Sequence, residues 1–164
     1  MMQQPEQDID DRLYRNVMGS FATGVTVITT TVDDTVYGMT ANAFMSVSLN
    51  PRLVAISIGE KANMLQHIKK SKQFAINILS STQQKESKQF AGQLDAEVNI
   101  TFSTFKGLPI LEKSLGIITC ELYNDYVVGD HTIFIGHVTG VQLEQKDPLL
   151  FCQGKYRELS EIER

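Results

Sequence analysis

Apolar side chains recur at every fourth position near the start of the chain. Ile9, Leu13, Val17 and Phe21 have this spacing, which places them on one face of an α-helix. Asp8 precedes them, where its carboxylate can cap the first turn. The pattern predicts an N-terminal helix from Ile9 to Phe21 whose apolar stripe packs against the rest of the fold.

β-branched residues dominate the next segment, Val25 to Val32, which reads VTVITTTV. This composition favours a strand, because branched side chains are crowded in a helix. The two aspartates that follow predict a turn, and a return strand is expected from Thr35 to Met39. Gly38 in that strand indicates a bulge or a close backbone approach.

Further strands and short helices follow along the chain. Buried strands are expected at Leu53 to Ile58, at Phe74 to Leu79, and in two long stretches between Gly116 and Leu143 that meet near Gly129. Helices are expected from Asn63, the predicted N-cap, to Ser71, and from Thr82 to Ala91, where Gly92 ends the helix. Numerous adjacent strands with few helices predict an α+β, mainly β fold, an antiparallel barrel with peripheral helices.

Length and composition narrow the class of protein. A chain of 164 residues with 42% hydrophobic and 21% charged residues fits one globular domain over residues 1–164. A net charge of -4 argues against nucleic acid as the main partner, because phosphate binding needs clustered positive charge. The polar, acidic start and the lack of an apolar run of about 20 residues argue against secretion and a membrane, and favour the cytoplasm.

The sequence lacks the motifs of several kinds of catalytic and nucleotide-binding site. Cys120 and Cys152 lie far apart, and the three histidines have no ligand spacing, so no metal site is expected. The sequence contains no G-x-S-x-G elbow, no G-x-G-x-x-G fingerprint and no P-loop. If a nucleotide binds, an architecture other than these holds it.

The segment from Gly38 to Pro51 gathers hydroxyl and amide side chains between two apolar strands, at Thr40, Asn42, Ser46 and Ser48. Such neutral groups suit the edges of an isoalloxazine ring, its ribityl chain and a phosphate, which need many directional hydrogen bonds and little protein charge. The alternative is a polar loop that caps one end of the barrel.

Two further clusters are candidate binding sites. Ser57, Lys61 and Asn63 lie between a strand and a helix start, where backbone donors can hold a phosphate, and the alternative is a solvated loop. Ser87 and Phe90 offer a hydroxyl and an aromatic ring, although Phe90 fits the core equally well. His131 stands at the junction of two strands, where a side chain can project into a cleft.

Six fragments carry a family resemblance: FATGVTVITT, GMTANAFMSVSLNP, FAINIL, SKQFAG, VVGDHTIFIG and DPLLFCQGKYREL, in this order. Together they cover nearly the whole chain and resemble the flavin reductase-like family, which includes reductase components of two-component flavin monooxygenases. The resemblance implies a split-barrel flavin-binding fold, a homodimer, and FMN or FAD bound near the subunit interface.

The resemblance also implies roles for individual residues, although two residues, Met45 and Cys152, depart from the commonest family pattern. Residues along the isoalloxazine ring and ribityl chain would be Thr40, Asn42, Ala43, Ser46, Val47 and Ser48. Those toward the phosphate end would be Ser57, Lys61, Asn63, Ser87 and Phe90. His131, in the G-D-H motif, would face the nicotinamide, and Tyr156 would close the same cleft.

The expected activity is hydride transfer from NADH or NADPH to FMN or FAD, with the reduced flavin supplied to a partner monooxygenase. The flavin carries the redox chemistry, so no catalytic side chain is required. A flavin-binding electron carrier or sensor of the same fold is the main alternative, and a structural barrel without a ligand is another.

Overall fold

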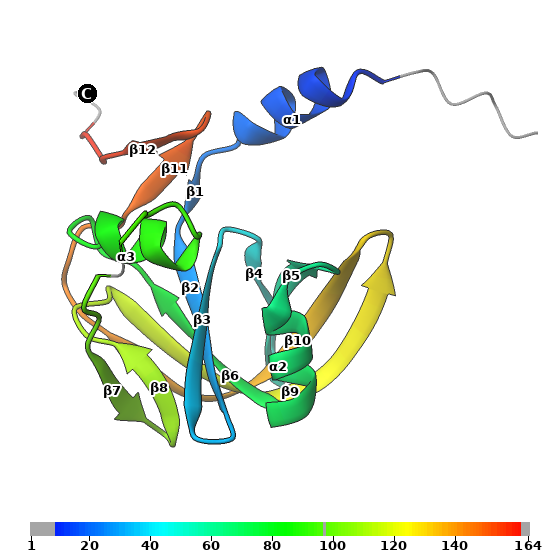
Figure 1. Ribbon diagram of the computed structural model, residues 1–164, viewed down its shortest axis with the longest axis vertical. Helices are drawn as coiled ribbons and strands as arrows, with labels where there is room; N and C mark the ends of the chain where they lie inside the picture. Colours follow the sequence, from blue (N-terminus) through cyan, green and yellow to red (C-terminus); the bar gives the residue numbers. More distant parts are fainter. Residues whose placement is uncertain (1–8, 97, 162–164) are drawn as a thin grey trace, which may run out of the picture.

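A strongly curved antiparallel sheet forms the centre of the molecule (Figure 1). The computed structural model describes residues 9–96 and 98–161. The sheet has seven strands, in the order β3 (Thr35–Ala41), β2 (Thr26–Val32), β6 (Gln73–Ile78), β9 (Gly116–Val128), β10 (His131–Leu143), β5 (Arg52–Gly59) and β4 (Phe44–Leu49). Its two edge strands, β3 and β4, are consecutive in the chain, so the curvature brings the edges toward each other at the linker Asn42–Ala43. The expected mainly β fold with peripheral helices is confirmed.

Tight turns set the register of the central hairpins. Asp33 and Asp34 have φ values of 49° and 61° between β2 and β3, the left-handed conformation that two-residue hairpin turns require. The predicted return strand is therefore present, and it runs on to Ala41. The two long strands β9 and β10 meet at Gly129, with φ of 61°, as the sequence predicts.

The segment from Gly38 to Pro51 is not the polar loop of the alternative interpretation. Its second half forms strand β4, which pairs with β5 from Phe44 opposite Ile56 to Leu49 opposite Arg52. A register shift between Ser46 and Ser48 bends this edge strand. Alternating serines and apolar residues suit an edge strand with much of its surface in water, and for that reason composition alone did not separate it from a loop.

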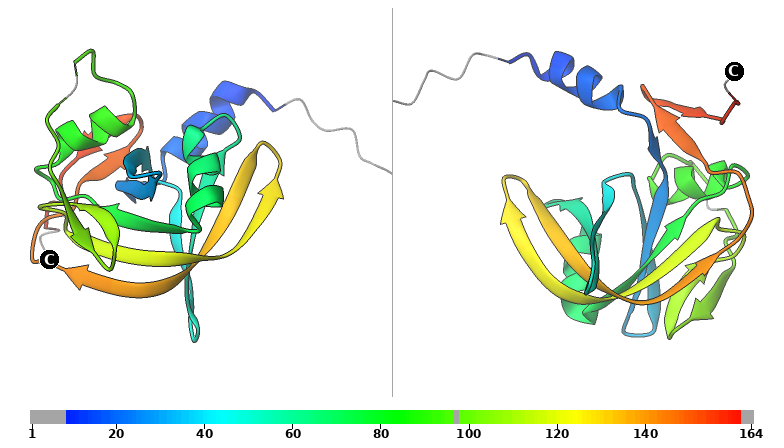
Figure 2. Two further views of the ribbon diagram at one scale, coloured as in Figure 1. Left: turned by 60° about the horizontal axis from the view of Figure 1, so that its bottom comes forward. Right: turned by 180° about the vertical axis from the view of Figure 1, so that it is seen from behind.

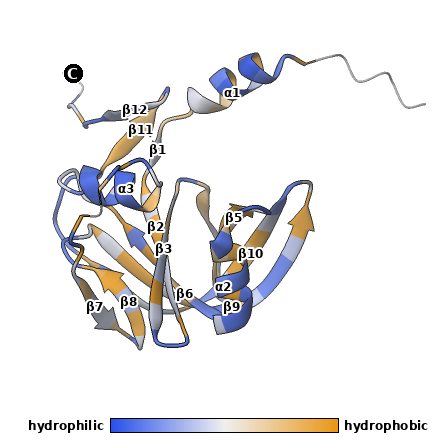
Figure 3. Ribbon diagram, viewed as in Figure 1, coloured by the Kyte–Doolittle hydropathy of each residue, from blue (hydrophilic) through white to orange (hydrophobic). Residues whose placement is uncertain are grey.

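Helix α2 (Asn63–Ser71) packs against the curved sheet through Met64, Leu65 and Ile68, which are all buried. They join a core that includes Phe74 and Phe134. The predicted capping role of Asn63 is wrong by one position, because Ala62 is the N-cap and no side chain caps this helix. Figure 3 shows the outer surface of α2 as hydrophilic, while hydrophobic residues concentrate on the strands.

Helix α3 (Gln84–Phe90) and the hairpin of β7 (Phe102–Phe105) and β8 (Leu108–Leu111) flank the other end of the sheet. The close approach expected at Gly38 is confirmed, because a Cβ there would lie 2.5 Å from the ring of Phe90. Phe90 thereby packs over β3, against the core cluster that contains Val25 and Leu79. The helix ends at Phe90 with Ala91 as its C-cap, and Gly92 follows with φ of 67°, as expected for a helix stop.

An arm extends from the barrel at the chain ends (Figure 2). It consists of α1 (Asp11–Gly19) and a small sheet of β1 (Thr23–Gly24), β11 (Leu150–Cys152) and β12 (Lys155–Arg157). The backbone N–H of Gln153 donates to the carbonyl of Gly19 at 2.7 Å, and this bond ties the end of α1 to the turn between β11 and β12.

Two predictions for α1 need correction. The N-cap is Asp10, whose side chain accepts from the backbone N–H of Leu13, whereas Asp8 lies outside the described residues. The apolar stripe does not pack against the rest of the fold: Leu13, Val17 and Phe21 are 60%, 62% and 75% exposed. The spacing predicted the helix correctly, but it carries no information about what covers the stripe.

None of the described helices has the length and apolar character needed to cross a membrane. The cytoplasmic location and the single-domain organisation stay predictions.

Candidate functional site

A cleft with an apolar lining lies between the arm and the barrel. Its volume is about 540 Å³, and we call it the apolar chamber. The barrel side is formed by Asn42, Ala43, Phe44, Met45, Ala55, Ile56, Ser57 and Ile133, and the arm side by Met18, Gly19, Phe21, Thr23 and Phe151. No charged side chain is among these lining residues. The chamber therefore suits a flat, largely apolar group that forms a few hydrogen bonds at its edges.

A smaller cleft of about 160 Å³ adjoins the first, and we call it the polar chamber. Its lining residues are Val25, Thr40, Ala41, Asn42, Ser87, Ala91, Gln93, Phe151 and Tyr156. Asn42 and Phe151 line both chambers. The two clefts thus meet at the linker between β3 and β4, where an apolar surface gives way to hydroxyl and amide groups.

Hydrogen bonds fix the wall of the polar chamber. The Thr40 hydroxyl donates to the backbone carbonyl of Ser87 at 2.7 Å, and the hydroxyls of Ser87 and Tyr156 lie 2.9 Å apart. The Lys88 ammonium lies 5.8 Å from the centre of the Tyr156 ring, within cation–π range. Strand β3, helix α3 and strand β12 are therefore joined at this point.

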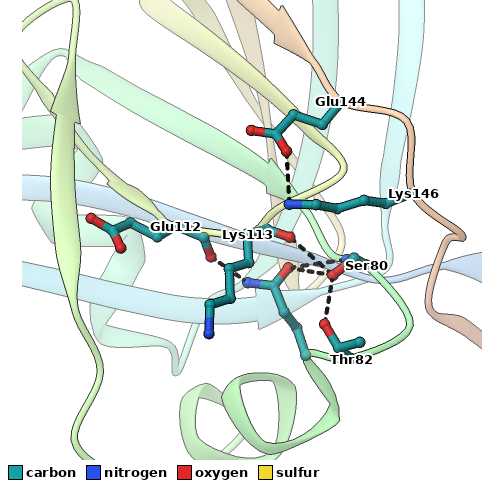
Figure 4. Close-up of polar contacts among 7 residues, drawn as sticks. Ser80, Thr82, Glu112, Lys113, Glu144 and Lys146 are labelled. Atoms are coloured by element: carbon teal, nitrogen blue, oxygen red, sulfur yellow. Dashed lines mark hydrogen bonds and ion pairs between the residues drawn. The ribbon is translucent and has the colours of Figure 1, made fainter.

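A polar network holds the start of α3 in place (Figure 4). The Ser80 hydroxyl donates to the carbonyl of Lys113 at 2.9 Å, and the Gln83 amide donates to the carbonyl of Glu112 at 2.9 Å. Gln83 is 1% exposed and its Oε1 accepts from the backbone N–H of Ser80. The segment that leads into Ser87 is therefore anchored to the turn between β8 and β9.

The residues expected from the sequence divide according to these two clefts. Those that line a chamber are Thr40, Asn42, Ala43, Ser57, Ser87 and Tyr156. Those that line neither are Ser46, Val47, Ser48, Lys61, Asn63, Phe90 and His131. The side chains of Asn42 and Ser57 form no hydrogen bond with any other described residue, so both are free to bond a ligand.

Residues Ser46, Val47 and Ser48 follow the chamber wall along β4. Ala43, Phe44 and Met45 line the apolar chamber, and Ser46, Val47 and Ser48 lie further along β4, beyond these lining residues. Lys61 and Asn63 are exposed and follow β5 in the chain, and Lys61 lies close enough to Asp130 for its charge to lower the pKa of that carboxyl. Phe90 belongs to the core, as the alternative interpretation of the sequence had it.

His131 stands at the rim of the apolar chamber. It pairs with Gly59 across β10 and β5, and Ile133 pairs with Ser57 two residues further on. Ile133 and Ser57 both line the chamber, and residues two apart share one face of a strand. His131 therefore lies on the chamber's face of the sheet, about 7 Å farther along the strand.

A carboxylate orients the His131 ring. His131 Nδ1 lies 2.6 Å from Oδ1 of Asp130. The hydrogen bond from His131 lowers the pKa of Asp130, with smaller contributions from the charges of His131 and Lys61. The Asp130 carboxylate therefore stays ionised at neutral pH and can accept a hydrogen bond from His131 Nδ1, which leaves Nε2 outside this contact.

Sequence reasoning missed the arm side of the apolar chamber. Phe21 and Thr23 occur in the fragment FATGVTVITT, and Phe151 occurs in DPLLFCQGKYREL, so the signal was present in the resemblance. The pairing of Thr23 with Phe151 between β1 and β11 brings these distant segments together. The Thr23 hydroxyl is buried without a hydrogen-bond partner among the described residues, which leaves one polar group at this wall unsatisfied.

A family model described as a flavin reductase like domain matches residues 18–160. The chain belongs to this family. The match covers both chambers and the segment that carries His131. The family resemblance expected from the sequence is therefore confirmed.

Named relatives and solved structures agree with this assignment. An NADH-dependent flavin reductase from a Rhodococcus species is 38% identical over 92% of this chain and 87% of its own length. The reductase component of a 4-hydroxyphenylacetate 3-monooxygenase from Thermus thermophilus is 35% identical over 89% of this chain and 95% of its own. The structure of the flavin reductase PheA2 in its native state superposes with a TM-score of 0.92, at 56% identity over 93% of this chain and 100% of that one.

The residues of the two chambers fit a flavin. The apolar chamber is uncharged, as a ring held by neutral hydrogen bonds requires, and it borders unengaged groups on Asn42, Ser57 and Thr23. The adjoining polar chamber offers the hydroxyls of Thr40, Ser87 and Tyr156. This arrangement matches a molecule with an apolar ring system and a polar tail.

Proposed function

We propose that the protein is an NADH-dependent flavin reductase that binds the isoalloxazine ring of FMN or FAD in the apolar chamber. The observation that carries the proposal is the uncharged chamber with unengaged amide and hydroxyl groups on one side and His131 at its rim. An NAD(P)H:flavin oxidoreductase activity agrees with the family and with the names of the relatives.

The bound flavin supplies the redox chemistry by accepting hydride from the nicotinamide. The protein's own residues bind and orient the flavin ring and exclude water from it. Ala43, Ala55 and Ile133 offer small or apolar surface to the ring, and Asn42 and Ser57 offer hydrogen bonds to its polar edge. No general base is needed, which agrees with a chamber that contains no titratable side chain.

His131 is positioned to contact the nicotinamide side of the cleft. The contact with Asp130 restricts rotation of the His131 ring, so Nε2 keeps one position at the rim of the apolar chamber. The exposed fraction of the His131 side chain, 50%, leaves it accessible to a ligand that enters after the flavin. We assign it a role in binding the hydride donor.

The proposed active unit is a homodimer. The apolar stripe of α1 ends at Phe21, which lines the apolar chamber together with Met18, and the two residues are 75% and 55% exposed. A second copy placed over α1 would cover the stripe and the mouth of the chamber together, and it would remove apolar area that is otherwise in water. The family resemblance implies a homodimer, which supports a second copy of this chain as the partner at this surface.

The reduced flavin is proposed to serve a separate monooxygenase. Some relatives are named as reductase components of two-component monooxygenases, the Thermus thermophilus protein among them.

Anaerobic mixing tests the proposal. The protein with bound FMN or FAD is mixed with NADH, and bleaching of the flavin absorbance is followed. Rapid bleaching is expected, whereas flavin that binds and stays oxidised would indicate an electron carrier, and failure to bind either flavin would refute the proposal.

A matched pair of variants locates the site. Ala43→Trp fills the apolar chamber from an exposed position and should abolish flavin binding without disturbing the core. Thr35→Trp places the same side chain at the far, exposed end of β3 and should leave binding and bleaching unchanged. Equal behaviour of the two variants would place the flavin elsewhere.

A further inference from the structure

Phe151 stands at the junction of the two chambers. Its side chain lines both the apolar and the polar chamber, and among the described residues it shares this position only with Asn42. Asn42 belongs to the barrel, whereas Phe151 belongs to β11 of the arm. The two residues therefore face the junction from opposite sides.

The Phe151 ring is held in one orientation by its neighbours. It meets the ring of Tyr156 edge-on, with 5.4 Å between centroids and 69° between planes. Tyr156 is in turn fixed through its hydroxyl to Ser87, and Phe151 also packs against the core cluster that contains Val25 and Leu149. An edge-on aromatic pair packed on a core keeps the ring from rotating freely, so it acts as a fixed wall.

The chemistry changes across this wall. On one side the lining is mainly hydrocarbon, from residues such as Ile56 and Ile133, and on the other it carries the hydroxyls and amides of Thr40, Ser87 and Gln93. A flavin has the same division, with an apolar ring system and a polyol tail joined at one ring nitrogen. A flavin that fills both chambers must pass beside Phe151.

We propose that Phe151 is a specificity-determining residue that directs the flavin's tail into the polar chamber and so favours tailed flavins over the bare ring. The proposal rests on the proposed function, because it assumes that the apolar chamber holds the ring. Without the fixed aromatic wall, the two chambers merge, and the tail loses the surface that orients it. The ring keeps most of its contacts with the barrel side.

The test compares flavins that differ only in the tail. Dissociation constants of lumiflavin, which lacks the ribityl chain, and of riboflavin and FMN are measured by fluorescence titration for the wild type and Phe151→Leu. Leucine keeps an apolar side chain of similar volume but removes the planar wall. We expect the preference for FMN over lumiflavin to fall by about tenfold, the scale of one lost oriented aromatic contact.

Phe102→Leu is the matched control. Phe102 packs on the same core cluster and lines neither chamber, so its variant should keep the wild-type preference. Unfolding midpoints of both variants show whether the fold survives, and Phe151→Met is an alternative if leucine is not tolerated. Steady-state kinetics should show a raised KM for FMN at an unchanged kcat, because the ring's seat is preserved.

Two results overturn the proposal. The first is a preference for FMN over lumiflavin that is unchanged or increased in Phe151→Leu, which includes the case in which both flavins bind more weakly by the same factor and Phe151 contacts the ring alone. The second is a preference that falls as much in Phe102→Leu as in Phe151→Leu. Failure of the proposed flavin binding is distinguishable, because in that case the wild-type protein binds none of the three flavins, and a failure of hydride transfer alone leaves these dissociation constants unaffected.

Discussion

The hydroxyl of Tyr156 lies 2.9 Å from the hydroxyl of Ser87, and this contact joins the C-terminal strand to α3 across the polar chamber. The two residues are 69 positions apart in the sequence. Ser87 is buried, so its hydroxyl has few other partners available. The contact makes the C-terminal hairpin part of the wall of the polar chamber.

Tyr156→Phe is expected to weaken FMN binding about two- to tenfold, because the loss of one hydrogen bond of about 0.5–1.5 kcal/mol leaves the Ser87 hydroxyl without its orienting partner. Fluorescence titration measures the change. Tyr126→Phe removes an exposed hydroxyl outside both chambers and should bind FMN as the wild type does. An unaltered affinity in Tyr156→Phe would remove this contact from the account.

His131→Ala is expected to lower kcat/KM for NADH by about tenfold or more, while the dissociation constant of the flavin changes by less than about twofold. Flavin binding is little affected because His131 lies at the rim of the apolar chamber rather than in its wall. Stopped-flow bleaching of the flavin across NADH concentrations measures kcat/KM for NADH. His137→Ala, on the same strand, is the control, and identical rates for both variants would exclude His131 from the site.

Asn77→Ala is expected to destabilise the fold by about 2–4 kcal/mol, because Asn77 is fully buried and its loss strands several polar groups. Its amide donates to the Val27 carbonyl and the Thr29 hydroxyl, and its carbonyl oxygen accepts from the backbone N–H of Leu111 at 2.7 Å. Urea unfolding measures the cost. Asn124→Ala, at an exposed position, should cost less than about 0.5 kcal/mol, and similar costs for the two would contradict this role.

Leu13→Glu in α1 is expected to convert a dimer into a monomer, because the charge would lie in the middle of the apolar stripe at the proposed interface. Light scattering coupled to size-exclusion chromatography measures the mass. Arg15→Glu changes charge on the opposite side of the same helix and should leave the dimer intact. A monomeric wild type, or a dimeric Leu13→Glu, would contradict the proposed interface.

Local patterns predicted most elements of the fold. The β-branched run of Val25 to Val32 and the paired aspartates after it specify β2 and its turn through backbone preference alone. The hairpin of β7 and β8 was missed although Lys106 and Gly107, both with positive φ, form its turn. A lysine at the first turn position is not a strong signal, because other residue types dominate such turns.

The site was harder to predict because its walls come from distant segments. The polar chamber joins Thr40, Ser87 and Tyr156, and no local periodicity relates residues so far apart. The family resemblance placed all three near the ligands but at different parts of them: Thr40 along the ring and ribityl chain, Ser87 at the phosphate end and Tyr156 at the nicotinamide cleft. Phe21 and Phe151 were overlooked because an apolar residue in a sequence has the same pattern whether it packs in a core or lines a cleft.

A crystal structure of the protein with FMN tests the central claim most directly. We expect the isoalloxazine ring in the apolar chamber, against Ala43 and Ser57, with its tail passing Phe151 toward Ser87. A ring bound elsewhere, with the apolar chamber filled by the protein's own side chains, would contradict the account.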